Sequence, residues 1–195
     1  SQDAVTADTV QLARRLLDDK IDDRQGARGF ALHVIWQDAL RNDRLDETLD
    51  YLSGHFTEYF ADDGGWSKWS IVTDWYMGAM LMAAGREELA MRVLQPLLDN
   101  SRERAEEYGT GNFHVWNLAA AQKKDELLIA LRQVLEAEQG PDNWPTAIGP
   151  LPAFDFVRDE PEYRDYLAFL ENRAAEQREE LARLLGTEQK KRGPT

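Results

Sequence analysis

The sequence predicts an all-α protein: an α-α superhelix of about three helical hairpins, with a half-repeat before them and a capping helix after them. One helix-turn-helix pattern recurs in Trp36–Leu52, Gly78–Leu94 and Val115–Leu131. Apolar residues recur at helical spacing along most of the chain, and no segment shows the strict alternation that is typical of a strand. Successive segments are offset by 42 and 37 residues. A repeat of about this length is typical of helical solenoids, in which each hairpin buries its apolar face against its neighbours.

The three segments agree at equivalent positions, which strengthens the repeat. Each segment contains an apolar helix, a small or polar corner, a charged start to the next helix and a second apolar run. A basic residue follows the corner in all three segments, and the last aligned position is always leucine. The aligned columns are Arg44, Arg86 and Lys123; then Thr48, Ala90 and Leu127; then Leu52, Leu94 and Leu131.

The first predicted helix has a capping residue, an apolar stripe and glycines after its end. Thr6 or Asp8 can cap its start, because both side chains accept hydrogen bonds from the first turn. We expect the helix to end at Asp22, since Gly26 and Gly29 follow it. It resembles the second helix of a repeat whose first helix is missing, which predicts that the natural protein continues before residue 1.

Apolar periodicity predicts further helices as far as a proline-rich segment. The turn cluster Ala61–Ser67 and the glycines at 85, 109 and 111 mark breaks between them. The expected helices are Phe30–Arg41, Leu45–Phe60, Lys68–Ala84, Glu87–Tyr108, Phe113–Ala121 and Asp125–Glu138.

The proline-rich segment Gly140–Pro152 precedes the last helix. It holds four of the seven prolines, so it cannot form a regular helix. The last helix is expected to start near Asp159 or at Pro161, because proline favours the first helical turn. Its sequence becomes heavily charged, as a capping helix requires. We therefore expect one helical-repeat domain over residues 1–186 and a flexible tail over residues 187–195.

The chain is acidic, and this limits its partners. There are 23 lysine and arginine residues against 36 acidic ones, which gives a formal net charge of −13. Nucleic acid is an unsuitable partner, because phosphate binding needs exposed clusters of Lys and Arg. No apolar run approaches the roughly 20 residues that cross a bilayer, so we expect no membrane insertion by this segment. The expected partner is a protein or peptide, or a small effector.

Four aspartates near the end of the first helix offer an enzymatic alternative. Asp18, Asp19, Asp22 and Asp23 form DDKIDD, and carboxylates one turn apart on a helix can bind magnesium, as in isoprenoid synthases. The motif lies at a helix end, however, and no second magnesium motif follows it. A solvated acidic helix terminus is therefore the favoured interpretation.

Other signatures of chemistry are missing from the sequence. It has no cysteine, which excludes thiolate catalysis and cysteine-ligated zinc. It has no Glu-x-x-His pair, no Walker motif and no GxGxxG or GxSxG motif. We therefore expect no catalytic residue, no metal site and no cofactor.

The hairpin pattern resembles the tetratricopeptide repeat. Ala79, Gly85 and Ala90 match small-residue positions of that pattern. The spacing is longer than the usual repeat of about 34 residues. Trp36 and Thr48 also differ from the small residues that the tetratricopeptide pattern normally has at these two positions.

The C-terminal half resembles a more specific group. It looks like the helical-repeat region that follows an adenylate-cyclase, winged-helix or kinase domain in large bacterial signalling proteins. The stretch FDFVRDEPEY, Phe154–Tyr163, is the nearest feature to a signature, and the resemblance covers roughly Phe30–Leu185. It implies a superhelical fold with a sensory or protein-binding role, and it carries over no catalytic residue.

The resemblance also implies which first-helix positions line a concave groove. Transferring the repeat register gives one row of His33, Trp75 and Asn112, and a second row of Gln37, Ala79 and Trp116. Aromatic and amide groups suit an extended peptide backbone or a small ligand. Complete burial of both tryptophans between helices would contradict this groove.

We therefore expect a non-catalytic protein-interaction or sensory module, part of a larger bacterial signalling or regulatory protein in the cytoplasm or the periplasm. Two alternatives remain. One is a dimerisation or spacer domain that associates through the C-terminal helix or an aromatic loop. The other is a magnesium-dependent all-α enzyme that uses the four aspartates.

Overall fold

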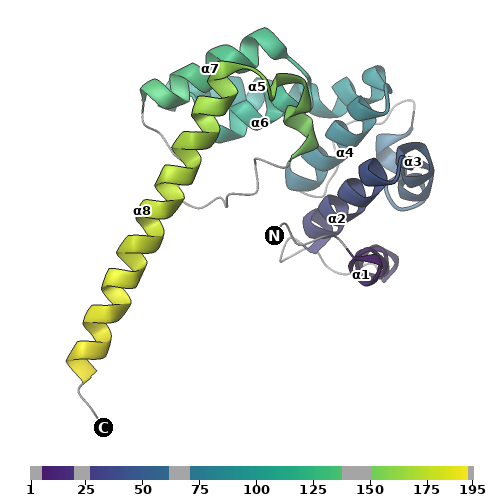
Figure 1. The fold of residues 1–195 in the computed structure, drawn as a ribbon. Helices are drawn as coiled ribbons and strands as arrows, with labels where there is room; N and C mark the ends of the chain where they lie inside the picture. The colour runs from purple at the N-terminus through teal and green to yellow at the C-terminus, as the bar shows by residue number, and fades with distance from the viewer. Residues whose placement is uncertain (1–5, 20–26, 62–70, 138–150, 193–195) are drawn as a thin grey trace.

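The computed structural model describes residues 6–19, 27–61, 71–137 and 151–192, which form helices joined by turns (Figure 1). These residues contain no β-strand, so the all-α prediction is confirmed for this part of the chain. Asp22, Asp23 and Gly26 lie outside the described residues, as do residues 62–67 of the turn cluster and 140–150 of the proline-rich segment. None of the described helices is long and apolar enough to cross a membrane.

The first helix, α1 (Ala7–Asp18), begins after Thr6, one of the two predicted caps, and ends at Asp18, before the predicted end at Asp22. The Thr6 hydroxyl accepts a hydrogen bond from the backbone N–H of Thr9 at 3.2 Å. This bond satisfies one of the free donors at the helix start. The helix packs against α2 (Ala27–Arg41) through its apolar face. The buried residues of that face are Val10, Ala13 and Leu17.

Gly29 lies inside α2 instead of in a break before it. A Cβ added at this position would lie 2.7 Å from a methyl group of Val72, at the start of α4. Real Cβ contacts are longer than this, so a larger residue would require the Val72 side chain or the helices to shift. The glycine therefore permits a close approach of α2 and α4, which the sequence pattern alone did not distinguish from a helix break.

The second helix of the first hairpin is shorter than predicted. α3 (Leu45–Ser53) is followed by a 3-10 turn, η1 (Thr57–Tyr59), so the prediction of one helix as far as Phe60 is wrong at its end. The Tyr59 hydroxyl donates a hydrogen bond to the carboxylate of Asp74 on α4, and both side chains are buried. Because a carboxylate out of water needs such a donor, this long-range bond stabilises the turn against α4.

The other helices of the repeat segments lie close to their predicted bounds. α5 (Glu87–Tyr108) matches its prediction and continues through Pro96. Residues 68–70, where the preceding helix was expected to start, lie outside the described residues. The remaining helices are α4 (Ile71–Ala83), α6 (Asn112–Ala120) and α7 (Lys124–Glu136).

One turn geometry recurs in the three hairpins. The last residue of each turn donates its backbone N–H to a carbonyl five residues earlier, and the residue before it has a positive φ. These hydrogen bonds join Arg44 to Ala39, Arg86 to Leu81 and Lys123 to Leu118, at 2.8, 2.9 and 3.0 Å. The positive φ angles are 50° at Asp43, 71° at Gly85 and 52° at Gln122. Both features define the Schellman motif that ends a helix. The backbone therefore repeats where the sequence columns repeat.

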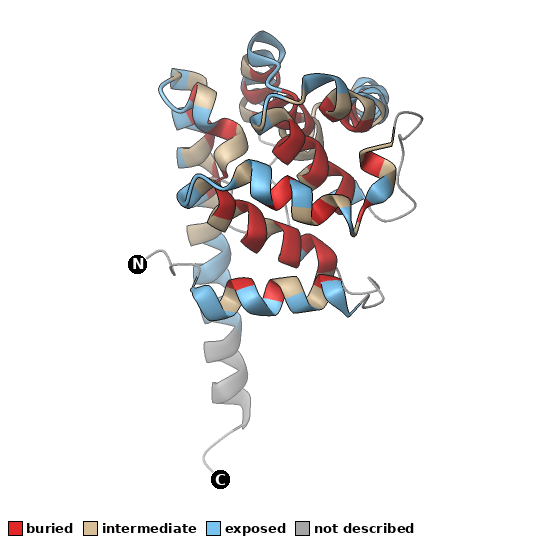
Figure 2. Ribbon diagram, turned by 90° about the vertical axis from the view of Figure 1, so that its right-hand side faces the viewer, coloured by how far each residue is buried: buried red, intermediate tan, exposed pale blue. Residues whose placement is uncertain are grey.

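Successive hairpins are neighbours and share one apolar core. α2 packs against α3 and α4, α4 packs against α5 and α6, and α6 packs against α5 and α7. Buried residues gather on the central helices, and exposed residues dominate the outer ones (Figure 2). The aligned leucines Leu52, Leu94 and Leu131 are all completely buried. Equivalent sequence positions thus have the same packing role in each hairpin.

The last helix starts on this body and then leaves it. A 3-10 turn, η2 (Pro152–Val157), precedes α8 (Pro161–Arg192), which begins at the predicted proline. Its first turns bury aromatic side chains, but the described side chains after Leu170 are exposed or half-buried, and the helix projects outwards (Figure 1). Residues 187–192, expected in a flexible tail, are helical. A single glycine such as Gly186 costs a helix only about 1 kcal/mol.

Candidate ligand-binding pocket

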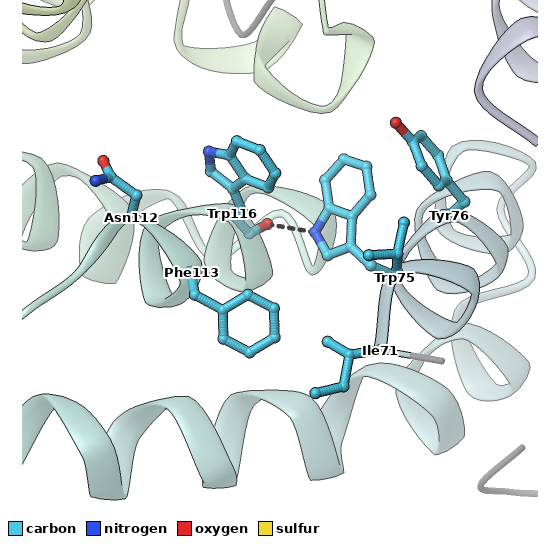
Figure 3. Close-up of a pocket in the computed structure, with 7 residues that line it drawn as sticks. Ile71, Trp75, Tyr76, Asn112, Phe113 and Trp116 are labelled. Carbon is cyan, nitrogen blue, oxygen red and sulfur yellow. Dashed lines mark hydrogen bonds between the residues drawn. The ribbon is translucent and has the colours of Figure 1, made fainter. Parts of the chain in front are cut away.

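A pocket lies between α4 and α6, the first helices of the second and third hairpins (Figure 3). Its volume is about 130 Å³. Its walls are aromatic and aliphatic, their polar side-chain groups are one amide, one hydroxyl and two indole N–H groups, and none of the described lining residues carries a charge. The lining residues are Ile71, Val72, Trp75 and Tyr76 from α4, and Asn112, Phe113 and Trp116 from α6.

Helical spacing explains why these residues share one surface. On α4 the lining residues are at positions 71 and 72 and, one turn later, at 75 and 76. On α6 they are at positions 112 and 113 and, one turn later, at 116. Residues separated by three or four positions lie on the same face of a helix. Two such faces set side by side form the two walls of the pocket.

Trp75 forms the fixed wall between the two helices. Its indole N–H donates a hydrogen bond to the backbone carbonyl oxygen of Trp116 at 3.0 Å, which ties α4 to α6. Its ring centroid lies 5.9 Å from those of both Trp36 and Trp116. Trp75 is only 4% exposed, whereas Trp116 is half-buried. Trp116 therefore offers the open aromatic surface, and Trp75 fixes its position.

On the side of α2, a chain of polar side chains reaches the pocket through Tyr76. The side-chain N–H group of Gln37 donates to His33 Nε2 at 3.1 Å, and His33 Nδ1 lies 3.1 Å from the Tyr76 hydroxyl. Burial lowers the pKa of His33, which favours the neutral ring. Burial also raises the pKa of Tyr76 to about 12, so its hydroxyl stays protonated at neutral pH.

On the other side, the C-terminal helix supports the pocket through Asn112. The hydroxyl of Tyr166 on α8 donates a hydrogen bond to Asn112 Oδ1. Burial raises the pKa of Tyr166, and a contact with the Trp116 side chain acts in the opposite direction. This bond holds the Asn112 amide in one orientation at the pocket edge.

The structure brings most of the predicted groove residues together. Trp75, Asn112 and Trp116 line the pocket, and Trp116 is not fully buried. His33 and Gln37 lie behind Tyr76 and are half-buried. Ala79 is buried in the core at 3% exposure and does not line the pocket.

The repeat register did not identify four of the lining residues: Ile71, Val72, Tyr76 and Phe113. Each of them is adjacent to Trp75 or Trp116 in the sequence, or three or four positions away. Helical spacing around these two tryptophans could therefore have identified them. Ile71 and Val72 are also unusual as exposed aliphatic residues, at 44% and 38% exposure.

The described part of the acidic motif does not form a metal centre. The Asp18 carboxylate accepts a hydrogen bond from the Tyr51 hydroxyl at 2.9 Å and lies 3.2 Å from His55 Nε2. Among the described residues, no group of three or more potential metal ligands gathers there or elsewhere. Asp22 and Asp23 lie outside these residues.

A serine and a histidine meet away from the pocket. Ser101 Oγ donates to the Leu98 carbonyl oxygen at 3.0 Å, and His114 Nδ1 lies 2.9 Å from the same hydroxyl. Ser101 is only 3% exposed, so a substrate would not reach it. We interpret this pair as a link between α5 and α6 and not as a nucleophile with its base.

Neither the protein-family models, nor the characterised proteins, nor the solved structures compared with this chain gave a match.

Proposed function

We propose that the protein is a helical-repeat binding module whose aromatic pocket holds an apolar side chain of a partner protein. The observation that carries this proposal is the pocket between α4 and α6. It has two tryptophan walls, and none of its described lining residues carries a charge. Aromatic pockets of this kind supply much of the energy of protein interfaces, because they remove apolar area from water at a rigid site.

The size of the pocket favours one side chain over a whole small molecule. Sites for drug-sized ligands usually measure about 300–1,000 Å³. A cavity of roughly 150 Å³ holds one benzene molecule. The pocket of about 130 Å³ therefore fits a leucine, methionine or phenylalanine side chain.

The repeated hairpins support the wider part of the proposal. Three turns share one hydrogen-bond pattern, and α2, α4 and α6 follow one another as neighbours. This is the local order expected if the hairpins stack into an α-α superhelix of the tetratricopeptide type. On this proposal the module belongs to a larger bacterial signalling protein and couples the capture of a partner to a neighbouring domain.

The test uses N-acetyl-phenylalanine methylamide as a probe of the pocket. We expect saturable changes in the indole N–H resonances of Trp75 and Trp116 in heteronuclear NMR spectra. Ile71→Glu should weaken this binding at least tenfold, because it places a charge at the rim of an apolar pocket. Ile71 is 44% exposed, so the fold should tolerate the change.

Ile129→Glu is the matched control. Ile129 lies on α7, is 50% exposed and does not line the pocket, so this variant should bind the probe like the unaltered protein. Equal effects of the two substitutions, or no change in either indole resonance with the unaltered protein, would contradict the proposal.

A dimerisation domain is the second candidate function, because α8 carries exposed leucines beyond the body. Leu181 and Leu184 are 57% and 50% exposed. Exposed leucines one turn apart on a projecting helix favour association with another helix. Sedimentation over a wide concentration range distinguishes the candidates: a monomer at all concentrations that still binds the probe excludes the dimerisation domain.

A further inference from the structure

In each hydrogen bond beside the pocket, one group donates and the other accepts. These assignments determine which polar groups remain free to bind a ligand. On the α2 side, the Gln37 amide N–H donates to His33 Nε2, so this ring nitrogen is an acceptor. A neutral histidine then carries its proton on Nδ1 and donates it to the Tyr76 hydroxyl, 3.1 Å away. The hydroxyl proton of Tyr76 is therefore not used by His33.

On the α8 side of the pocket, the side-chain group that remains free is also a hydrogen-bond donor. Asn112 Oδ1 accepts the hydrogen bond of the Tyr166 hydroxyl, which leaves the two N–H donors of the Asn112 amide. No described residue accepts from that amide group. In Figure 3 the Asn112 amide and the Tyr76 hydroxyl lie at the edge of the cluster away from Phe113 and Ile71.

Among the described residues, the free hydrogens at the pocket edge are thus those of the Tyr76 hydroxyl and the Asn112 amide, whereas the oxygen of each group already accepts one hydrogen bond. The walls also contain two indole N–H groups: that of Trp75 donates to the Trp116 carbonyl oxygen, and that of Trp116 interacts with the Tyr166 side chain. A ligand that satisfies these two donors must therefore bring acceptors. None of the described lining residues is a cation, and the chain has a net charge of −13, so a carboxylate would be repelled without compensation.

We infer that the pocket recognises an apolar side chain on an extended peptide segment, whose flanking backbone carbonyl oxygens accept hydrogen bonds from Tyr76 and Asn112. This inference rests on the proposed function. The carbonyl oxygen is the neutral acceptor that every peptide carries. The interior of an α-helix is excluded as the anchor, because its carbonyls already accept hydrogen bonds within the helix. An extended segment keeps them free.

The experiment compares a probe that has carbonyl groups with one that lacks them. N-acetyl-phenylalanine methylamide and propylbenzene share the aromatic anchor, but only the first has acceptors. We expect the peptide probe to bind at least fivefold more tightly to the unaltered protein, as a single hydrogen bond of about 1 kcal/mol requires. This comparison needs no substitution, so it stands even if a variant fails to fold.

Two near-isosteric substitutions then assign the donors. Tyr76→Phe removes the hydroxyl and keeps the ring. Asn112→Asp keeps the acceptor for Tyr166 and replaces the N–H donors, and a carboxylate is tolerated at a helix N-terminus. Each should weaken the peptide probe about fivefold and change propylbenzene binding less than twofold.

The outcomes separate this inference from the proposed function. If both probes bind equally, or if both variants weaken both probes alike, the carbonyl recognition is wrong while the apolar pocket stands. If neither probe perturbs Trp75 or Trp116, the proposed function itself fails.

Discussion

His33 and His114 illustrate how partial burial changes the chemistry of single side chains in this protein. Both rings are half-buried and bonded to a neighbouring hydroxyl, His33 to Tyr76 and His114 to Ser101. Burial lowers the pKa of each ring below the usual value, and the Arg102 guanidinium lowers that of His114 further against an opposing effect of Glu126. Both histidines are therefore neutral links between helices at neutral pH.

We predict that the protein loses stability as the pH falls from 7.5 to 5.5. An unfolded histidine takes up a proton near pH 6.5, whereas these two resist protonation in the folded state. The unfolded state then binds more protons, so the free energy of unfolding decreases below about pH 6.5. We expect less than about 1 kcal/mol from each histidine, because both are partly exposed and solvent screens the effect. Urea denaturation at several pH values measures this dependence.

The double variant His33→Asn, His114→Asn provides the comparison. It should show a flatter dependence between pH 7.5 and 5.5, while the carboxyl groups titrate mainly below this range. A stability that is constant or rises towards pH 5.5 in the unaltered protein would refute the assignment of these rings as buried and neutral.

The helices and their turns follow rules that act within a few residues. The Schellman turns of the three hairpins place Asp43, Gly85 and Gln122 at positive φ. Only glycine adopts this conformation without a steric penalty. The turn between α4 and α5 therefore has the optimal residue, and the other two carry a strain that the surrounding hairpin maintains.

We predict opposite effects of glycine substitutions at two equivalent turns. Gln122→Gly should stabilise the protein by about 0.5–1 kcal/mol, since it relieves the strain at φ 52°. Gly85→Ala should destabilise it by about 1 kcal/mol. No atom lies within 4 Å of a Cβ added at Gly85, so backbone strain alone causes this loss. Urea denaturation measures both changes.

Gly54→Ala is the control for the backbone argument. Gly54 has a φ of −75°, and an added Cβ would make an ordinary contact of 3.6 Å with the Tyr51 carbonyl oxygen. We therefore expect no loss of stability at this position. A loss equal to that of Gly85→Ala would show that the sign of φ does not control the effect.

The molecule as a unit combines a packed body with a projecting helix, and α8 belongs to both. Its first turns place Tyr163 and Tyr166 in the core, at 1% and 0% exposure, and its later described turns leave the body. Tyr166 also holds Asn112 at the pocket edge. The start of α8 therefore supports both the core and the pocket.

We predict different results for two truncations of α8. A chain that ends after Asn172 should keep its stability within about 1 kcal/mol and still bind N-acetyl-phenylalanine methylamide, because the described side chains beyond this point are exposed or half-buried. A chain that ends after Arg158 should lose several kcal/mol, since it loses two buried tyrosines and a buried leucine. Urea denaturation and NMR titration measure the two properties. Unfolding of the longer truncated chain would contradict this division of the helix.

Local features could be predicted because their causes are local. The Thr6 cap, the bounds of α5, the start of α8 at Pro161 and the three equivalent turns depend on contacts within about five residues. The end of α3 was predicted less well, since the Tyr59–Asp74 bond joins two elements. Gly29 was misassigned for a similar reason, because Val72 lies far along the chain.

The sequence by itself determined the helical class, the repeated hairpins and the two tryptophans of the candidate site. The register was sufficient for Trp75 and Trp116, since both occupy repeated first-helix positions. Only the tertiary structure decided that these helices enclose a pocket, that Tyr76 completes it and that the Tyr76 hydroxyl and the Asn112 amide lie beside it. Those properties depend on bonds between distant residues, such as Trp75 to Trp116 and Asn112 to Tyr166, and no periodicity within one helix specifies them.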